Sequence, residues 1–391
     1  MKIHTLFLLL AAFCLLTQVA VGQDAQQFVL NGSGARAAGM GNAFTGVADD
    51  ATAISWNSAG LTQLYSAEAS VVARFGFGSL NADYQDVNVD VTTGSSFQLN
   101  FASLAFPFTV GKLNVVGGVA YRRVLDFTQN FEISAEEGGM EATTSTDNTG
   151  GVDAISPSVG IQLSDMISAG ATVNIYTGST DYVTETTGLL GDNKFESSEE
   201  YSGVGIDIGV LVKPSPQFQI GANLNLPQSL TITQKDDMDD YEYTLKVPFF
   251  FSIGAAIRAS DNLTIAADYR GRNWASAKLD FDGEEFEFTD QSANSFHIGM
   301  EYLAQAGKSV VPLRIGFYTL PTPDTDYKDD QITFSAITAG AGVILGNVIL
   351  DGSFEYVFGS YVGDEDFVTG NDVDYSVSDF RITIGGTIHF G

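Results

Sequence analysis

The chain has 391 residues with 48 acidic and 18 basic side chains, which gives a formal charge of -30 at pH 7. This charge argues against sequence-independent binding to nucleic acid, because phosphates would be repelled, and a single cysteine excludes an internal disulfide or a Cys-based zinc site. Hydrophobic residues make up 44% of the chain, too many for an acidic disordered coil.

The first 22 residues have the features of a secretory signal peptide. Lys2 precedes an apolar run from Leu6 to Leu16, and Ala20-Val21-Gly22 is a small-x-small cleavage triplet. We therefore expect residues 1–22 to be removed and the mature chain to start at Gln23. No later segment offers 18 consecutive apolar residues for a spanning helix. A soluble exported protein and an outer-membrane β-barrel remain, since a barrel needs no such run.

Residues 31–62 are rich in Gly and Ala and show no alternation of apolar and polar side chains. A chain of this composition packs closely against other backbone. Asp49 and Asp50 are placed to cap a short helix that runs through Trp56. If a barrel follows, this segment is the natural candidate for a piece folded into the lumen.

From residue 65 onward the sequence alternates with a period of two. Residues 263–270, 347–358 and 380–390 each place Leu, Ile, Val, Phe or Tyr on one face and mostly polar residues on the other. Such alternation over about ten residues predicts strands with one apolar and one polar face.

Six short turns alternate with seven long polar loops, so thirteen connections predict fourteen strands. An even strand number with short turns at one rim and long loops at the other is typical of bacterial transmembrane barrels. The turns are expected near 109–112, 163–166, 214–217, 260–262, 305–308 and 345–347, and the loops near 79–95, 126–152, 178–200, 233–244, 277–291, 319–331 and 360–379. The region 270–290 is also a candidate extension above the membrane.

The long loops hold 36 of the 48 acidic side chains and only four lysines. Charges are thus kept out of the predicted lipid-facing strands, where each would cost about 2–4 kcal/mol near mid-membrane. A soluble β-sandwich or propeller with acidic loops is the alternative. It is disfavoured because so many apolar faces are hard to bury in one soluble core.

The N-terminal segment also carries a family resemblance. Its run Gly34-Ala35-Arg36-Ala37-Ala38-Gly39-Met40-Gly41, followed by Ala48-Asp49-Asp50 and Asn57-Ser58-Ala59-Gly60-Leu61, resembles the start of the FadL-type outer-membrane transporters. The related PorV and PorQ proteins of type IX secretion have a similar opening. The motif residues are Gly34, Gly39, Gly41, Asp49, Asp50, Asn57, Ala59 and Gly60. The family usually has proline where this chain has Ser58, which puts the rigidity of that turn in doubt.

The resemblance implies an all-β transmembrane barrel, residues 64–391, with an N-terminal luminal plug, residues 23–63. It implies passive uptake of hydrophobic small molecules such as long-chain fatty acids across the bacterial outer membrane. The alternative is a PorV- or PorQ-like docking component that binds secretion-system proteins. Expected partners are outer-membrane lipid and lipopolysaccharide, the barrel-assembly machinery during insertion, and the hydrophobic ligand.

Alternation places basic and acidic side chains together on the luminal face. They either brace the lumen as a network of ion pairs, or one or two arginines bind the carboxylate of an amphipathic ligand through paired hydrogen bonds. The candidate ligand-binding residues are Arg74, Arg270, Arg314 and Arg381; Arg122, Glu68, Asp268, Glu301, Asp351 and Glu355 share the face.

No enzyme activity, cofactor or metal is expected. His297 is predicted to point inward without a nucleophile or activated water beside it. The acidic clusters at 236–240, 324–326 and 364–366 offer oxygen ligands for calcium, but they lack the spacing of an EF-hand loop, and solvated loops are the favoured interpretation.

Overall fold

The structure, a computed structural model, describes residues 32–84, 87–92, 94–137, 140–188, 192–236, 240–307, 309–363 and 373–391. The predicted signal peptide lies outside these residues, as do residues 237–239 and 364–366 of the acidic clusters. Within the described ranges, no helix is long and apolar enough to cross a membrane.

Fourteen antiparallel strands form a closed barrel, as the turn count predicted. Each strand pairs with the next along the chain, and the last pairs with the first from Ala67 opposite Phe390 to Asp83 opposite Asp374. The single closed sheet excludes the sandwich and propeller alternatives. The barrel strands are β1 (Ala67–Tyr84), β3 (Ser96–Val110), β4 (Leu113–Asp126), β6 (Met140–Gln162), β7 (Ile167–Gly188), β8 (Asn193–Ser215), β9 (Phe218–Asn225), β12 (Phe250–Ser260), β13 (Leu263–Arg272), β16 (Ser295–Ala306), β17 (Ser309–Thr325), β18 (Gln331–Leu345), β19 (Val348–Gly363) and β20 (Val373–Phe390).

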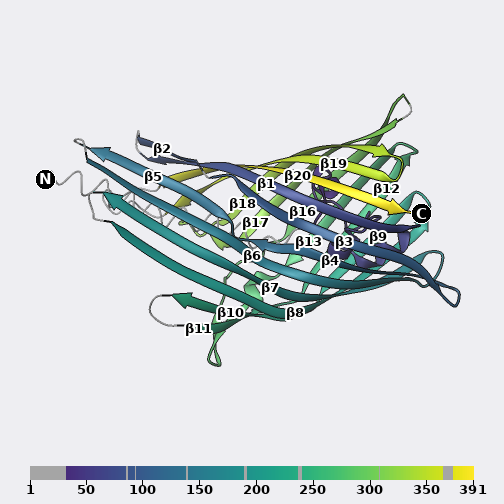
Figure 1. The fold of residues 1–391 in the computed structure, drawn as a ribbon, viewed down its shortest axis with the longest axis horizontal. Coiled ribbons are helices and arrows are strands. Elements are labelled where there is room, and N and C mark those ends of the chain that lie inside the picture. The colour runs from purple at the N-terminus through teal and green to yellow at the C-terminus, as the bar shows by residue number, and fades with distance from the viewer. Residues whose placement is uncertain are drawn as a thin grey trace.

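All six predicted short turns lie at one rim, which is also where the C-terminus lies (Figure 1). Gly111, Gly307 and Gly346 occupy three of these turns with φ between 63° and 68°, a left-handed conformation that glycine adopts without strain. At the opposite rim, several strands continue far into the stretches predicted as loops. The loops are therefore largely long hairpins rather than irregular chain.

Six further strands lie outside the barrel ring. β2 (Val87–Thr92) pairs with β1, and β5 (Gln129–Glu137) pairs with β6. A small sheet is joined to the N-terminal half of β8 through β10. It consists of β10 (Gln228–Asp236), β11 (Tyr241–Val247), β14 (Lys278–Phe281) and β15 (Glu284–Glu287). A 3-10 turn, η2 (Trp274–Ser276), leads into β14. The extension predicted within 270–290 is thus the β14–β15 hairpin.

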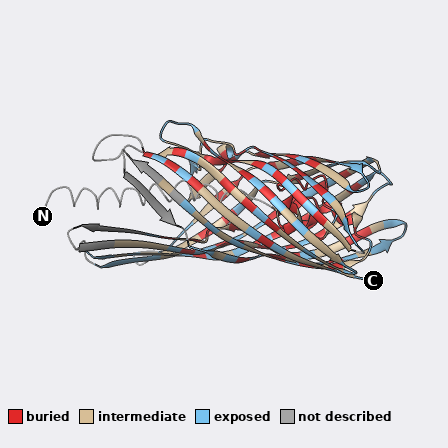
Figure 2. Ribbon diagram, turned by 90° about the horizontal axis from the view of Figure 1, so that it is seen from above, coloured by how far each residue is buried: buried red, intermediate tan, exposed pale blue. Residues whose placement is uncertain are grey.

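The barrel is apolar outside and polar inside. Along β16, Phe296, Ile298 and Met300 are 63%, 51% and 39% exposed, whereas His297 and Glu301 between and beside them are buried. Buried and exposed residues alternate in this way along most barrel strands (Figure 2). An apolar outer band with a polar interior is the arrangement that a lipid bilayer requires of a barrel.

Residues 32–64, which we call the luminal segment, lie inside the barrel toward the short-turn rim (Figure 1). The segment contains α2 (Ala35–Gly39), α3 (Ala53–Trp56) and η1 (Ser58–Gln63). Ala37, Phe44 and Leu61 are completely buried, and they belong to one cluster with the wall residues Phe101 and Val116. The segment contacts wall strands around the whole circumference.

Candidate functional site

A cavity lies along the inner side of the barrel wall where β3 and β4 separate, and it is lined by residues of β1, β3, β4, β5 and β20. The two strands pair from Val110 opposite Leu113 up to Phe101 opposite Arg122. Beyond this point, residues 96–99 of β3 pair with β1, while residues 123–126 of β4 pair with β6. The two strands therefore separate toward the long-loop rim, until the amide of Gly94 donates to the carbonyl of Asn130, and residues that border this gap line the cavity.

Irregular pairing accompanies the separation on both sides. The register between β1 and β3 shifts at Val72/Ala73, and the register between β4 and β6 shifts at Arg123/Leu125. Extra residues of this kind bend a strand and change where its side chains point. These two bulges lie at the level of the cavity. They allow β3 and β4 to separate there, while the two strands remain paired toward the short-turn rim.

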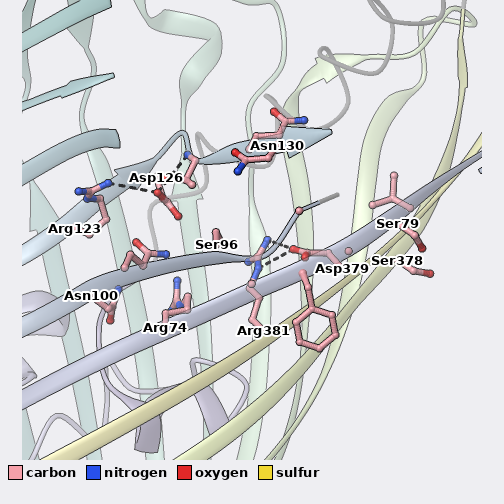
Figure 3. A pocket seen from close by; sticks show the side chains of 18 of the residues that line it. Arg74, Ser79, Ser96, Asn100, Arg123, Asp126, Asn130, Ser378, Asp379 and Arg381 are labelled. Carbon is pink, nitrogen blue, oxygen red and sulfur yellow. Dashed lines mark hydrogen bonds and ion pairs between the residues drawn. The ribbon is translucent and has the colours of Figure 1, made fainter. Parts of the chain in front are cut away.

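The cavity has a volume of about 170 Å³ and is predominantly polar. Arg74, Arg123 and Arg381 line it, together with the carboxylates of Asp126 and Asp379 and several amides and hydroxyls (Figure 3). Asp153, which does not line the cavity, also pairs with Arg123, so three carboxylates lie close to the three guanidinium groups.

Two of the three arginines are engaged by acidic neighbours. Arg123 donates to Asp153 at 2.6 Å and to Asp126 at 3.4 Å. Arg381 lies 2.7 Å from Asp379. These pairs fix both side chains in the cavity wall and neutralise most of their charge.

Arg74 differs from its neighbours. Within the part of the chain that the structure describes, its one hydrogen bond runs to the Thr383 hydroxyl at 3.4 Å, and it forms no ion pair. Gln98 lies directly opposite Arg74 in the β1–β3 register. The side-chain carbonyl oxygens of Gln98 and Asn100 are buried and accept no hydrogen bond from any described residue. The cavity thus combines an unpaired cation with two unused acceptors.

A second, smaller chamber of about 50 Å³ lies next to the first, because Arg123 and Val124 line both. Arg270 and Arg272 lie on its wall. Arg270 packs over the Trp56 ring and donates to the Asn42 carbonyl. Arg270, predicted as a ligand-binding residue, is thus tied to the luminal segment.

Arg314, another predicted ligand-binding residue, is held in a network of buried ion pairs. Its Nε donates to Glu301 at 2.6 Å and its Nη1 to Asp351 at 2.6 Å. Glu301 also accepts from Arg36 of the luminal segment. Arg314 therefore matches the predicted bracing role. Arg122 does so too, since it contacts Asn174 at 3.0 Å and lies 3.6 Å from Asp207.

The predicted motif residues hold the luminal segment in shape. Gly34 and Gly41 have φ of 118° and 61°, and Gly39 lies against Gly340 of β18. Asn57 bridges the segment to the wall, donating to the carbonyls of Thr45 and of Val210 in β8. Gly60 lies against Ala48, and no side chain would fit between them.

The turn without its proline is held by Asn57 instead. Its side-chain oxygen accepts from Ala59 N at 3.2 Å, and Ser58 begins η1. Asp49 and Asp50 do not cap α3 as predicted. Asp49 pairs with Arg36 at 2.5 Å, and Asp50 accepts from the amide of Thr52, just ahead of the helix.

Glycines of the wall form a seat for the luminal segment. A Cβ added at Gly299 would overlap the Met40 carbonyl, and one at Gly316 would overlap the amide of Gly41. Gly170 and Gly209 meet the backbone around Ala59 in the same way. The absence of side chains at these positions lets two backbones lie in direct contact.

His297 points inward, as predicted. Its ring nitrogens lie 2.8 Å from the Gly41 carbonyl and 2.9 Å from the Ser295 hydroxyl, and the ring stacks on Tyr318. These contacts give the imidazole a structural role, because it links Gly41 of the luminal segment to the wall.

Alternation alone missed three arginines of the lumen. Arg123 follows the inward-pointing Arg122, so a strict period of two assigns it to the outside; it lines the cavity because β4 has separated from β3 at this level. Arg272 is two residues from Arg270, so the same alternation could have placed it on the luminal face. Arg36 is the only basic residue between 31 and 62, and this could have identified it as a charge inside the lumen.

Comparison with solved structures shows which fold the chain shares. A FadL homologue of Pseudomonas aeruginosa superposes with a TM-score of 0.65 at 14% identity, over 93% of this chain and 98% of that chain. The toluene transporter TbuX of Ralstonia pickettii gives 0.62 at 16% identity, over 93% and 100%. The toluene transporter TodX of P. putida gives 0.63 at 13% identity, over 92% and 99%.

No protein-family model and no curated protein sequence matches the chain. The resemblance predicted from the N-terminal motif is thus confirmed at the level of the fold. This chain has the FadL-type barrel architecture along nearly its whole length.

Proposed function

We propose that the protein is an outer-membrane channel for the passive uptake of small hydrophobic or amphipathic molecules, which leave the barrel through the cavity between β3 and β4. The apolar outer face would meet the lipid and lipopolysaccharide of the outer membrane, after export by the signal peptide and insertion by the barrel-assembly machinery. Solved barrels of the same fold are described as toluene transporters or as a monoaromatic hydrocarbon channel.

The observation that carries this proposal is the combination of a filled lumen with a separated wall. The luminal segment contacts the wall on all sides near the short-turn rim, so a molecule moving along the barrel axis meets packed backbone. The cavity between β3 and β4 lies on the long-loop side of the segment. A sideways route avoids any displacement of the segment.

The outer surface beside the cavity is suited to receive an apolar molecule. Phe97 and Leu99 of β3 are 64% and 41% exposed on the outer face, and Phe75 of β1 is 40% exposed. Phe75 and Phe97 have ring centroids 4.9 Å apart. A molecule leaving between the strands would pass from a polar cavity to an aromatic, lipid-facing surface.

The cavity volume bears on which molecules pass. A cavity of about 150 Å³ holds one benzene ring, so about 170 Å³ holds a single ring or the head and first carbons of a chain. Long-chain fatty acids would extend beyond the cavity, with each further buried CH₂ adding about 0.8 kcal/mol of affinity.

Blocking the cavity tests the route. Gln98→Trp would fill the cavity from the inner face of β3, whereas Leu99→Trp, one residue along, adds the same ring to the lipid face. Uptake of toluene and of a fatty acid into proteoliposomes should fall several-fold with Gln98→Trp and stay unchanged with Leu99→Trp. Equal uptake by both variants would disprove the sideways route. No uptake by the unmodified protein, together with co-purifying secreted proteins, would favour the docking role.

A further inference from the structure

Arg74 gives the lining of the cavity between β3 and β4 the capacity to bind an anion. Arg74 is half-buried and forms no ion pair with any described residue. A cation withdrawn from water without a partner is costly, so such groups are normally paired. The two other arginines of the lining already have carboxylate partners. The free binding capacity for an anion therefore lies at Arg74.

Two buried acceptors of the same lining receive no hydrogen bond from a described residue. Gln98 and Asn100 are 9% and 3% exposed, and their side-chain carbonyl oxygens have no partner among the described residues. Buried acceptors in folded proteins are nearly always satisfied by protein, water or ligand. Gln98 faces Arg74 across the strand pair, where directly opposite side chains lie about 5 Å apart. A bound molecule would meet the cation and the acceptors together.

We propose that this cavity selects a hydroxylated carboxylate of about one ring in size, with its carboxylate on Arg74 and a hydroxyl donating to Gln98 or Asn100. A carboxylate accepts two hydrogen bonds from a guanidinium, and a hydroxyl supplies the donor that the amide oxygens lack. This inference rests on the proposed uptake function and narrows its substrate class. Unsubstituted hydrocarbons such as toluene offer neither group.

The ligand set separates the two recognition elements. We would measure binding to the purified full-length protein in detergent by titration calorimetry, using 3-hydroxybenzoate, benzoate, benzyl alcohol and toluene. The expected order is 3-hydroxybenzoate tightest, benzoate and benzyl alcohol each several-fold weaker, and toluene weakest. Equal affinity for toluene and 3-hydroxybenzoate would overturn the inference.

Variants assign each group to its residue. Arg74→Gln should weaken 3-hydroxybenzoate and benzoate about tenfold or more and leave benzyl alcohol unchanged. Gln98→Leu should remove most of the preference for 3-hydroxybenzoate over benzoate. Arg258→Gln, the same chemical change at an exposed site near a short turn, is the control and should bind as the unmodified protein does.

Folding and function are checked separately from selectivity. Heat-modifiable migration on a gel reports whether each variant forms a barrel, and Arg74→Lys provides a second variant that keeps the charge and should keep part of the affinity.

If the protein transports no small molecule yet binds 3-hydroxybenzoate through Arg74, the uptake proposal fails and the binding site stands. If toluene and 3-hydroxybenzoate are taken up equally and Arg74→Gln has no effect on binding, the site proposal fails and uptake stands.

Discussion

Arg36 of the luminal segment and Glu301 of β16 are joined by two hydrogen bonds of 2.9 Å each, from Nε to Oε2 and from Nη2 to Oε1. Arg314 donates to the same carboxylate from the neighbouring strand. One buried carboxylate thus links the segment to the wall through paired, charge-assisted bonds, which are stronger than neutral ones.

Glu301→Gln should loosen this link. The amide keeps the size of the side chain but leaves Arg36 and Arg314 without their shared negative charge, and breaking a buried pair from one side costs about 3–5 kcal/mol. Because Arg36 retains Asp49, we expect a loss of about 1–3 kcal/mol, measured as a lower thermal midpoint in detergent. Glu287→Gln, at an exposed pair on β15, should change stability by about 0–1 kcal/mol. An equal effect of both variants would contradict the linking role.

Gly299→Ala and Gly316→Ala should displace the luminal segment without preventing barrel formation. Each added methyl group would overlap backbone of Met40 or Gly41, and backbone cannot move aside as a flexible side chain can. We expect faster protease cleavage within the segment and higher conductance for small ions in planar bilayers. Gly352→Ala is the control, since its Cβ would meet open space.

The luminal segment should be held more tightly at acidic pH than at neutral pH. Burial raises the pKa of the Asp50 carboxyl and nearby Asp49 raises it further, against the opposing effect of Arg36. The ionised form therefore costs stability, and this cost appears as pH rises from about 4, the unfolded value, through the raised folded pKa. Proteolysis of the segment should quicken over that window, and Asp50→Asn should flatten the dependence. An unchanged slope in Asp50→Asn would assign it to another group, such as Glu68, which accepts from Ala51.

Much of the fold was readable from the sequence because lipid imposes a strict pattern. Phe296, Ile298 and Met300 must face outward, so alternation, short turns and acidic loops together predicted the strand number and the location of the turns. The same alternation placed the side chains of Arg270 and Arg314 on the luminal face, where the structure has them buried.

The cavity was not readable in this way, because it depends on departures from the period. Arg123, which alternation assigns to the outside, lines the cavity because the pairing of β3 and β4 ends at Arg122, and the sequence around it gives no separate signal. Which luminal arginine lacks an acidic partner also depends on tertiary distances. Arg74 and Arg314 look alike in sequence, yet Arg314 binds two carboxylates and Arg74 binds a hydroxyl.

The orientation of the barrel gives a direct test of the topology. An epitope inserted at Asp192, between β7 and β8, or at Asp282, at the tip of the β14–β15 hairpin, should be detected by antibody on intact cells. The same epitope at 214–217 should be detected only after permeabilisation, because that turn lies at the opposite rim. Labelling in the reverse pattern would mean that the long hairpins face inward.

Uptake of an anionic ligand should increase with ionic strength. The long loops hold 36 acidic residues and four lysines, so they repel an approaching carboxylate, and charged surfaces of this kind change association rates strongly. Screening shortens the range of that repulsion from about 30 Å at 0.01 M salt to about 8 Å at 0.15 M. The initial rate for 3-hydroxybenzoate in proteoliposomes should therefore rise about two- to fivefold over this range, while neutral benzyl alcohol should show no change. A rate for the anion that falls with salt would mean that attraction to Arg74, rather than repulsion by the loops, controls entry.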